Sequence, residues 1–336
     1  MRSALLQIDE EEPSPPLVGI ARLAAQGEWI REGHLVEYFT LPSHTLLNRC
    51  NSRRVPFAWT INPYRGCEFA CKYCYARYTH EFMEMRDGID FERKIYVKQQ
   101  AGWLLRQELK KVKRGEQIAI GTATDPYQPA EKRYEVTRGI LEELAQHHGL
   151  EIGLVTKSDL IVRDVDLLRS VAEHNSLFVN LTITTLDAKL ARMLEPRAPR
   201  PDLRFKAVRE LGAAKINAGV ICAPVLPGVT DSPGALEALV RATKEAGGKY
   251  IFANPLFLKS CSASVFMPFL EKEFPHLAVA YRKRFSRRAF VSKAYSKRIS
   301  ELMAKLRKRY GIGYEYSRRS RSAHPPAEEE QLRLFA

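Results

Sequence analysis

Short apolar segments rich in β-branched residues alternate with helical patterns along the middle of the chain, and this alternation constrains the fold most. The seven segments cover residues 57–61, 94–98, 117–121, 151–156, 177–184, 216–223 and 250–253. Their length and composition predict strands, and helical patterns lie between most of them. Such alternation predicts parallel strands joined by right-handed crossovers. Because six or seven strands are fewer than the eight that close a barrel, we expect an α/β partial barrel with one open side and an active site at the C-terminal strand ends.

The segments outside this alternation divide the 336 residues into one large domain and its appendages. Residues 1–50 lack a clear period and are expected to form an N-terminal arm that wraps on the core or is partly disordered. The barrel is expected over residues 51–256, a basic, aromatic-rich extension over 257–316 and a flexible tail over 317–336. No apolar run is long enough to span a bilayer, and the acidic N-terminus is unlike a signal peptide. We therefore expect a cytoplasmic protein that does not bind a membrane.

Three of the six cysteines, Cys67, Cys71 and Cys74, lie within eight residues after the first predicted strand. Iron–sulfur clusters are held by cysteine thiolates, commonly four, so a 4Fe–4S cubane held by three has one iron free to bind another ligand. The alternative is a structural zinc site that Cys50 or His80 completes. The sequence favours the cluster, because structural zinc usually uses two short cysteine pairs and no second Cys-x-x-Cys occurs.

The spacing Cys-x-x-x-Cys-x-aromatic-Cys, with Tyr73 as the aromatic residue, resembles the signature of radical S-adenosylmethionine (radical SAM) enzymes. More narrowly, the chain is similar to their spore photoproduct lyase-like branch, which includes proteins of the DNA repair photolyase type. Further short sequence segments support this resemblance, and they occur in the expected order between residues 60 and 230. They are residues 62–75, 121–129, 155–158, 181–185, 194–199 and 223–228.

The resemblance implies a (β/α)6-type radical SAM barrel with a 4Fe–4S cluster on the three cysteines and S-adenosylmethionine bound at the free iron. In this family, one electron from the cluster cleaves S-adenosylmethionine to a 5′-deoxyadenosyl radical, which abstracts hydrogen from an unactivated carbon. The cofactor performs the difficult chemistry, and the protein orients it. The electron is expected from a reduced flavodoxin or ferredoxin-type donor.

The resemblance also implies contacts to S-adenosylmethionine at successive strand ends. Tyr73 matches the aromatic residue beside the adenine. The other matching residues are Thr124 and Asp125 after the third predicted strand, Lys157 after the fourth, Thr182 and Thr184 at the end of the fifth, and Ala223 and Pro224 at the end of the sixth. Hydroxyls suit the ribose, a cation suits the carboxylate and apolar backbone suits the flat base. The structural alternatives are β-branched strand residues, a solvated lysine and a turn aspartate.

One position departs from the photoproduct lyases, which carry a hydrogen-donating cysteine at the end of the third strand. This chain has Thr122 and Ala123 there, and a hydroxyl O–H bond is too strong for that role. Cys222 is a candidate donor instead, although a buried cysteine is often an inert small hydrophobe. Glu195 and Arg197 are candidates for substrate contact; the alternative is a helix end with a surface ion pair.

Positive charge is concentrated near the C-terminus, where residues 281–321 contain 15 Lys or Arg and two Glu in a chain of net charge +14. Apolar residues at helical spacing, followed by Gly311, predict a basic amphipathic helix over residues 291–310. Aromatic residues interleave with the charge, a mixture typical of proteins that neutralise phosphates and stack bases. We expect contact with nucleic acid, DNA above all; the alternative is a solvated helix that covers the open barrel edge.

The last residues, Gln-Leu-Arg-Leu-Phe-Ala, resemble the peptide by which bacterial repair and replication proteins bind the DNA sliding clamp. The resemblance implies that Gln331, Leu332, Leu334 and Phe335 bind that partner. Arg333 departs from the small or acidic residue common at its position. The alternative is a tail that folds back on its own core.

Three hypotheses combine these features. The first is a radical SAM enzyme that acts on DNA, either as a repair-like lyase or in a modification reaction. The second is a radical SAM enzyme that modifies RNA or a peptide, so that the match to the clamp peptide is accidental. The third is a non-catalytic metal-binding nucleic acid module, which leaves the ordered phrases at the strand ends unexplained.

Overall fold

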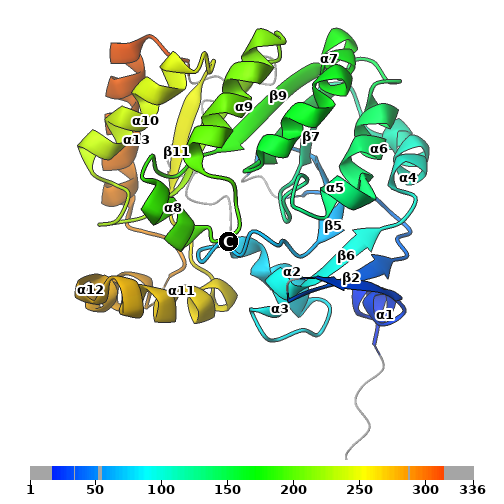
Figure 1. Ribbon diagram of the computed structural model, residues 1–336, viewed down its shortest axis with the longest axis horizontal. Coiled ribbons are helices and arrows are strands. Elements are labelled where there is room, and N and C mark those ends of the chain that lie inside the picture. Colours follow the sequence, from blue (N-terminus) through cyan, green and yellow to red (C-terminus); the bar gives the residue numbers. More distant parts are fainter. Residues whose placement is uncertain (1–16, 34, 52–54, 287, 314–336) are drawn as a thin grey trace, which may run out of the picture.

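Six parallel strands form the main sheet of the computed structural model, which describes residues 17–33, 35–51, 55–286 and 288–313 (Figure 1). Each strand pairs with the next in the order β4-β7-β8-β9-β10-β11, and β3 adds antiparallel to β4. Within the described residues the outer strands β3 and β11 do not pair with each other, which confirms the predicted partial barrel. The bounds are β3 Leu47–Arg49, β4 Trp59–Ile61, β7 Gln117–Ile120, β8 Glu151–Thr156, β9 Ser176–Thr182, β10 Ala218–Val225 and β11 Ile251–Pro255.

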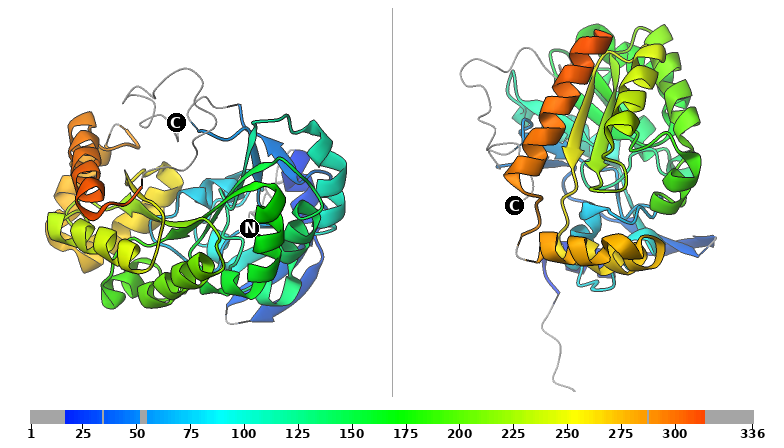
Figure 2. Two further views of the ribbon diagram at one scale, coloured as in Figure 1. Left: turned by 90° about the horizontal axis from the view of Figure 1, so that it is seen from above. Right: turned by 90° about the vertical axis from the view of Figure 1, so that its left-hand side faces the viewer.

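Helices cover the outer face of this sheet and bury one apolar stripe each against it (Figures 1 and 2). They are α4 Ala101–Glu108, α6 Val136–Leu144, α7 Val165–His174, α9 Pro201–Ala213 and α10 Pro233–Glu245. The C-terminal helix α13, Lys293–Tyr310, lies beside the edge strand β11 (Figure 2) and buries Ile299, Met303 and Leu306. It ends at Gly311, whose φ of 56° lies in the left-handed region. The predicted amphipathic helix and its glycine stop are confirmed.

A smaller sheet corrects two expectations from the sequence. The predicted strand at residues 94–98 is β6, Lys94–Lys98, but it lies outside the barrel, in a four-stranded sheet of order β1-β2-β6-β5. The segment expected as an N-terminal arm contributes regular structure to both sheets, because it contains β1, β2 and β3. The remaining bounds here are α1 Gly19–Ala25, β1 Trp29–Gly33, β2 Val36–Leu41 and β5 Tyr64–Arg65.

The loops at the C-terminal ends of the barrel strands meet two further helices, α11 Ser260–Glu273 and α12 Pro275–Phe285, and the short helix α8 Ala188–Leu194 (Figure 1). Their apolar side chains form a second core cluster together with Cys67, Cys71 and Tyr73. The cysteine loop therefore packs into the rim where the sequence predicts the active site. In the described part of the chain, no helix combines the length and the hydropathy that crossing a bilayer requires.

A close contact fixes the spacing between the last two barrel strands. A Cβ on Gly219 in β10 would lie 2.3 Å from the ring of Tyr250, the residue before β11. The ring is buried, and its hydroxyl lies 3.1 Å from both the carbonyl oxygen of Val179 and Oδ1 of Asn180 in β9, to which it donates. Glycine is required at position 219 because the tyrosine ring occupies the space of a side chain.

Replacing Gly219 by Ala is predicted to destabilise the protein by roughly 1–3 kcal/mol, since the ring must shift and lose its hydrogen bonds. Equilibrium unfolding in urea measures the difference. Gly212→Ala in α9 is the matched control, because its added Cβ would have its nearest neighbour at 3.8 Å. Alanine favours a helix interior by about 0.5–1 kcal/mol, so the control should be at least as stable as the wild type. Equal losses in both variants would contradict this account.

Candidate active site

The start of the cysteine loop is held against the smaller sheet by its backbone. Gly66 has a φ of 81°, and a Cβ there would lie 2.6 Å from the carbonyl oxygen of Lys94 and 2.9 Å from that of Phe91. The amide of Cys67 donates a 2.8 Å hydrogen bond to the Phe91 carbonyl. Only glycine permits this approach, so the backbone geometry requires a glycine immediately before Cys67.

The rest of the loop is fixed from three other segments. The amide of Lys72 donates to the carbonyl of Leu194 at the end of α8, at 2.9 Å. The Arg77 guanidinium donates to the Cys71 carbonyl at 3.0 Å and forms a 2.6 Å ion pair with Glu92. The hydroxyl of Ser262 in α11 donates to the Cys74 carbonyl at 2.9 Å. The spacing of the three cysteines is thus set by Arg77, which closely follows the loop, and by two groups far away in the sequence, Leu194 and Ser262.

The three thiols are free; Cys67 and Cys71 are buried and Cys74 is partly exposed. Burial raises the pKa of Cys67 well above its usual value and raises the pKa of Cys71 to about 12, although Lys157 opposes the second shift. Such thiols stay protonated until a metal replaces the proton. Among the described residues, no group of three His, Cys, Asp or Glu is placed to hold one metal ion. In a cubane each thiolate binds a different iron, so its three cysteines need not meet at one point.

The two residues that could complete a zinc site make other contacts. His80 packs its ring against Phe91 at 5.2 Å between centroids, and its Nε2 lies 3.2 Å from the Lys94 carbonyl oxygen. Burial lowers the pKa of His80 to about 4, so the ring is neutral. Cys50 follows β3, and among the described residues only its backbone is engaged: its amide donates to the Ala58 carbonyl at 2.8 Å, while its thiol is free and partly exposed.

Glu195 lies at the centre of a buried polar group beside the cysteine loop. Its carboxylate forms a 2.5 Å ion pair with Arg204 of α9, and both side chains are at most 1% exposed. It also accepts hydrogen bonds from the hydroxyl of Tyr73 and, at 3.4 Å, from that of Thr184. Burial alone would raise the pKa of Glu195, but Arg204 and Lys157 outweigh it and hold the pKa below its usual value. The carboxylate is therefore ionised.

Lys157 approaches the same group from the end of β8. Its Nζ lies 5.8 Å from the centroid of the Tyr73 ring, and its ammonium donates no hydrogen bond to any residue that the structure describes. Burial opposes its charge, but Cys71, Glu195 and Asp125 together raise the pKa of Lys157. The structure thus brings Tyr73, Lys157 and Thr184 together, as the sequence predicts, and adds Glu195 to them.

Thr124 and Asp125 are directed toward the protein's own backbone. One Asp125 oxygen accepts from the Thr156 hydroxyl at 2.6 Å and from the Tyr127 amide at 2.9 Å, and the other accepts from the Lys157 amide at 2.7 Å. The Thr124 hydroxyl donates to the Gly66 carbonyl at 2.6 Å. These contacts join the ends of β7 and β8 to the cysteine loop, so both residues hold the site together.

The other predicted residues lie around this group. Thr182 is buried at the end of β9, and Ala223 and Pro224 are half-buried in β10. Cys222 is fully buried in the barrel core, and its thiol lies 3.9 Å from the Thr184 carbonyl oxygen. Arg197 is exposed, 3.5 Å from the Glu92 carbonyl oxygen, so Glu195 and Arg197 do not form a pair.

Reasoning from the sequence misses two site residues. Arg204 is the buried partner of Glu195, and a signal for it exists: it lies on the apolar stripe of α9 with Val208 and Leu211, where a charge needs a buried partner. Tyr75 donates a hydrogen bond to the Thr122 carbonyl at the end of β7. That contact joins distant segments, and no pattern in the sequence indicates it.

Comparison with known proteins identifies the family. Residues 61–239 match the model of the Radical SAM superfamily. The chain belongs to this superfamily. An uncharacterized protein of Mycobacterium tuberculosis is 34% identical over 267 residues, which cover 79% of this chain and 78% of the relative. One of Methanocaldococcus jannaschii is 30% identical over 226 residues, which cover 67% and 80%.

Solved structures show the same fold. Spore photoproduct lyase complexed with dinucleoside spore photoproduct superposes with a TM-score of 0.62 at 15% identity, over 81% of this chain and 79% of that chain. Streptococcus suis SuiB bound to the precursor peptide SuiA gives a TM-score of 0.50 at 15% identity, over 76% and 47%. Superfamily membership implies S-adenosylmethionine and an iron–sulfur cluster as cofactors. The three thiols fit an iron–sulfur cluster, and the ammonium of Lys157 fits an anionic neighbour such as the cluster or a carboxylate.

Arg204→Ala is predicted to cost about 3–5 kcal/mol of stability, because it leaves the Glu195 charge buried without its partner. Arg200→Ala is the matched control, since Arg200 forms a 2.7 Å pair with Asp202 in which both side chains are well exposed. Such a surface pair contributes about 0–1 kcal/mol. Urea unfolding of the two variants tests the difference, and a similar small cost for both would show that the buried pair is not required.

Proposed function

We propose that this radical SAM protein is an enzyme that holds a 4Fe–4S cluster on Cys67, Cys71 and Cys74 and acts on DNA. The observation that carries the proposal is the set of three free thiols in one rigid loop beside a buried carboxylate and two cations. When bound, the cluster supplies the electron that breaks the sulfonium bond of S-adenosylmethionine. The free thiols also suit a reducing compartment such as the cytoplasm.

The residues around the cysteine loop support binding of S-adenosylmethionine. Lys157 offers an ammonium that lacks a hydrogen-bond acceptor among the described residues, and it would pair with the methionine carboxylate. Glu195 fixes the orientation of Tyr73 through its hydroxyl, so that the ring is held in place before the cofactor binds. The buried apolar cluster around them excludes water from a reactive intermediate.

The DNA substrate is supported by charge and by the structural relatives. The chain has a net charge of +14, most of which lies in the C-terminal part. The spore photoproduct lyase of similar fold is complexed with a dinucleoside photoproduct. Whether the reaction is a repair-like lyase step or a modification depends on the hydrogen donor. Thr122 occupies the position where the lyases carry their hydrogen-donating cysteine, and Cys222 is fully buried. Neither residue suits the return of a hydrogen atom to the substrate, so a modification reaction is favoured over a lyase step.

A peptide or RNA substrate is the second candidate. The likeness to SuiB, which is bound to a precursor peptide, favours this alternative, although it covers only 47% of that chain. A non-catalytic nucleic acid module is the weakest hypothesis, because it gives no role to the buried polar group formed by Glu195, Arg204, Tyr73, Thr184 and Lys157. A reduced flavodoxin or ferredoxin-type protein remains the proposed electron donor.

Cys71→Ala is predicted to abolish both the cluster and the release of 5′-deoxyadenosine. The protein would be reconstituted anaerobically with iron and sulfide, reduced with dithionite and given S-adenosylmethionine, with iron content and nucleoside measured separately. Cys50→Ala is the matched control, since Cys50 is a partly exposed cysteine outside the loop. It should retain iron and activity. Preferential uptake of zinc, or loss of metal in the Cys50 variant, would overturn the cluster assignment.

The C-terminal peptide provides a separate test of the DNA context; Gln331, Leu332, Leu334 and Phe335 lie outside the described residues. A synthetic peptide of residues 328–336 is predicted to bind a purified bacterial sliding clamp, and replacing Phe335 by Ala should weaken binding at least about 10-fold, as expected for a buried aromatic anchor. Fluorescence anisotropy measures both. Failure to bind, or equal binding by the two peptides, would remove the clamp as a partner and leave the radical chemistry untouched.

A further inference from the structure

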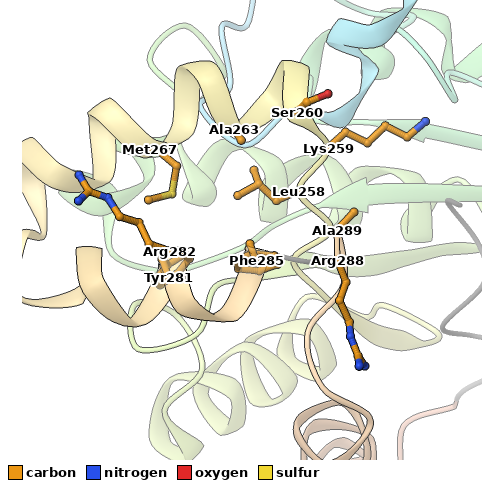
Figure 3. Close-up of a pocket in the computed structure, with 10 residues that line it drawn as sticks. All are labelled: Leu258, Lys259, Ser260, Ala263, Met267, Tyr281, Arg282, Phe285, Arg288 and Ala289. Atoms are coloured by element: carbon orange, nitrogen blue, oxygen red, sulfur yellow. The ribbon is translucent and has the colours of Figure 1, made fainter.

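A pocket of about 510 Å3 opens between α11, α12 and the segment that leads to α13, away from the Glu195 group. Figure 3 shows Leu258, Met267 and Phe285 directed into the space between the two helices. Leu258 is buried, whereas Met267 and Phe285 are half-buried, so apolar surface remains open there. A flat apolar group of the size of a nucleobase fits such a space.

Cations surround this apolar floor. Lys259 and Arg288 lie at one end of the pocket and Arg282 at the other (Figure 3). In the described part of the chain, neither Lys259 nor Arg288 forms an ion pair with a carboxylate. Arg282 is held in place by Glu271 at 2.6 Å, and Glu271 does not line the pocket. Lys259 Nζ lies 4.4 Å from the centroid of the Tyr78 ring, and the charged ends of Lys259, Arg282 and Arg288 extend outward from the apolar floor (Figure 3). The three cations thus border the pocket, where the phosphates on either side of a bound group would lie.

We propose that this pocket binds one unstacked base of a single-stranded nucleic acid, with the flanking phosphates on Arg282, Arg288 and Lys259. In a nucleic acid every unit joins a flat ring to an anionic phosphate. The pocket has the matching arrangement, because cations border its apolar floor. A duplex keeps its bases stacked, so the pocket selects single strands or an extruded base. The inference rests on the proposed function and states which residues bind its substrate.

The site adjoins the cysteine loop through one helix. Ser262 of α11 donates to the Cys74 carbonyl, while Ala263 and Met267 of the same helix line the pocket. Leu258 and Tyr281, also in the lining, belong to the same buried cluster as Cys71. A strand anchored here is held at the rim of the barrel where the chemistry is proposed.

Binding of a fluorescein-labelled single strand of roughly 12 nucleotides to the reconstituted full-length protein tests the proposal. Anisotropy titrations at about 50 mM and about 200 mM salt give affinity and salt dependence. Phe285→Ala should weaken binding about 5- to 100-fold with an unchanged salt slope, as loss of base stacking does. Arg288→Ala should lower the slope of log affinity against log salt by about 0.7, as loss of one phosphate contact does. Duplex of the same sequence should bind more weakly than the single strand.

Two controls separate the pocket from general basicity. Arg209→Ala removes an exposed arginine of α9 on the outside of the barrel and should change neither quantity. Lys305→Ala removes an exposed lysine of α13, the helix that the sequence indicates for nucleic acid contact. Circular dichroism confirms folding of each variant, and Arg288→Ala decides the matter if Phe285→Ala unfolds.

The outcomes distinguish the pocket from the proposed function. If wild-type protein binds the strand but Arg288→Ala binds as tightly and with the same slope, the pocket inference is overturned and the DNA substrate survives. A larger effect of Lys305→Ala would move the contact to α13. If wild-type protein binds no oligonucleotide, or binds an acidic, tyrosine-containing peptide more tightly through the same residues, the nucleic acid substrate itself is wrong.

Discussion

The hydrogen bonds that fix the backbone of the cysteine loop are the constraint on which the rest of the site depends. Three thiols can share one cluster only at a fixed spacing, yet residues 66–74 have no helix or strand of their own. Their backbone groups instead pair with Arg77, just after the loop, and with Phe91, Leu194 and Ser262, which come from segments far apart in the chain. The loop therefore acquires its geometry only when the barrel rim, the smaller sheet and α11 have assembled. The protein can therefore bind a cluster only once it has folded.

Charge balance explains why the site is built around Glu195. The carboxylate is matched by Arg204 at 2.5 Å, which leaves Lys157 with an ammonium that donates no hydrogen bond to the described residues. A half-buried ammonium without an acceptor is costly unless an anion joins it. The carboxylate of S-adenosylmethionine or the negatively charged cluster would provide one. The positions of these side chains are fixed, but the charge of Lys157 is left unbalanced, which favours a negatively charged group of a cofactor over water beside it.

The sequence predicts those parts of the fold and site that depend on local patterns. The strand predicted over residues 151–156 is β8, and the helix predicted before Gly311 is α13. The spacing of the three cysteines is read directly from the sequence. Residues 94–98 also form a strand, but a strand's own pattern does not name its partner, so their place in the smaller sheet could not be predicted. The sequence predicts a cofactor contact for Asp125, which stays a prediction; it does not indicate that the Asp125 oxygens accept from the Thr156 hydroxyl and from the amides of Tyr127 and Lys157. Pairing with a distant amide leaves no trace in the local sequence.

The basic C-terminal part shows why counting charges does not locate a binding surface. On α13, Arg298 pairs with Asp231 and Arg309 with Glu237, and the apolar stripe packs on α10 and β11. Two of the seven cations of α13 therefore pair with the segments that the helix packs against. The cations between α11 and α12 are fewer, but Lys259 and Arg288 lack carboxylate partners in the described residues and stand beside open apolar surface. A ligand site differs from a solvated helix in keeping both charge and apolar area available for a partner, and by that criterion the α11–α12 pocket is the stronger candidate.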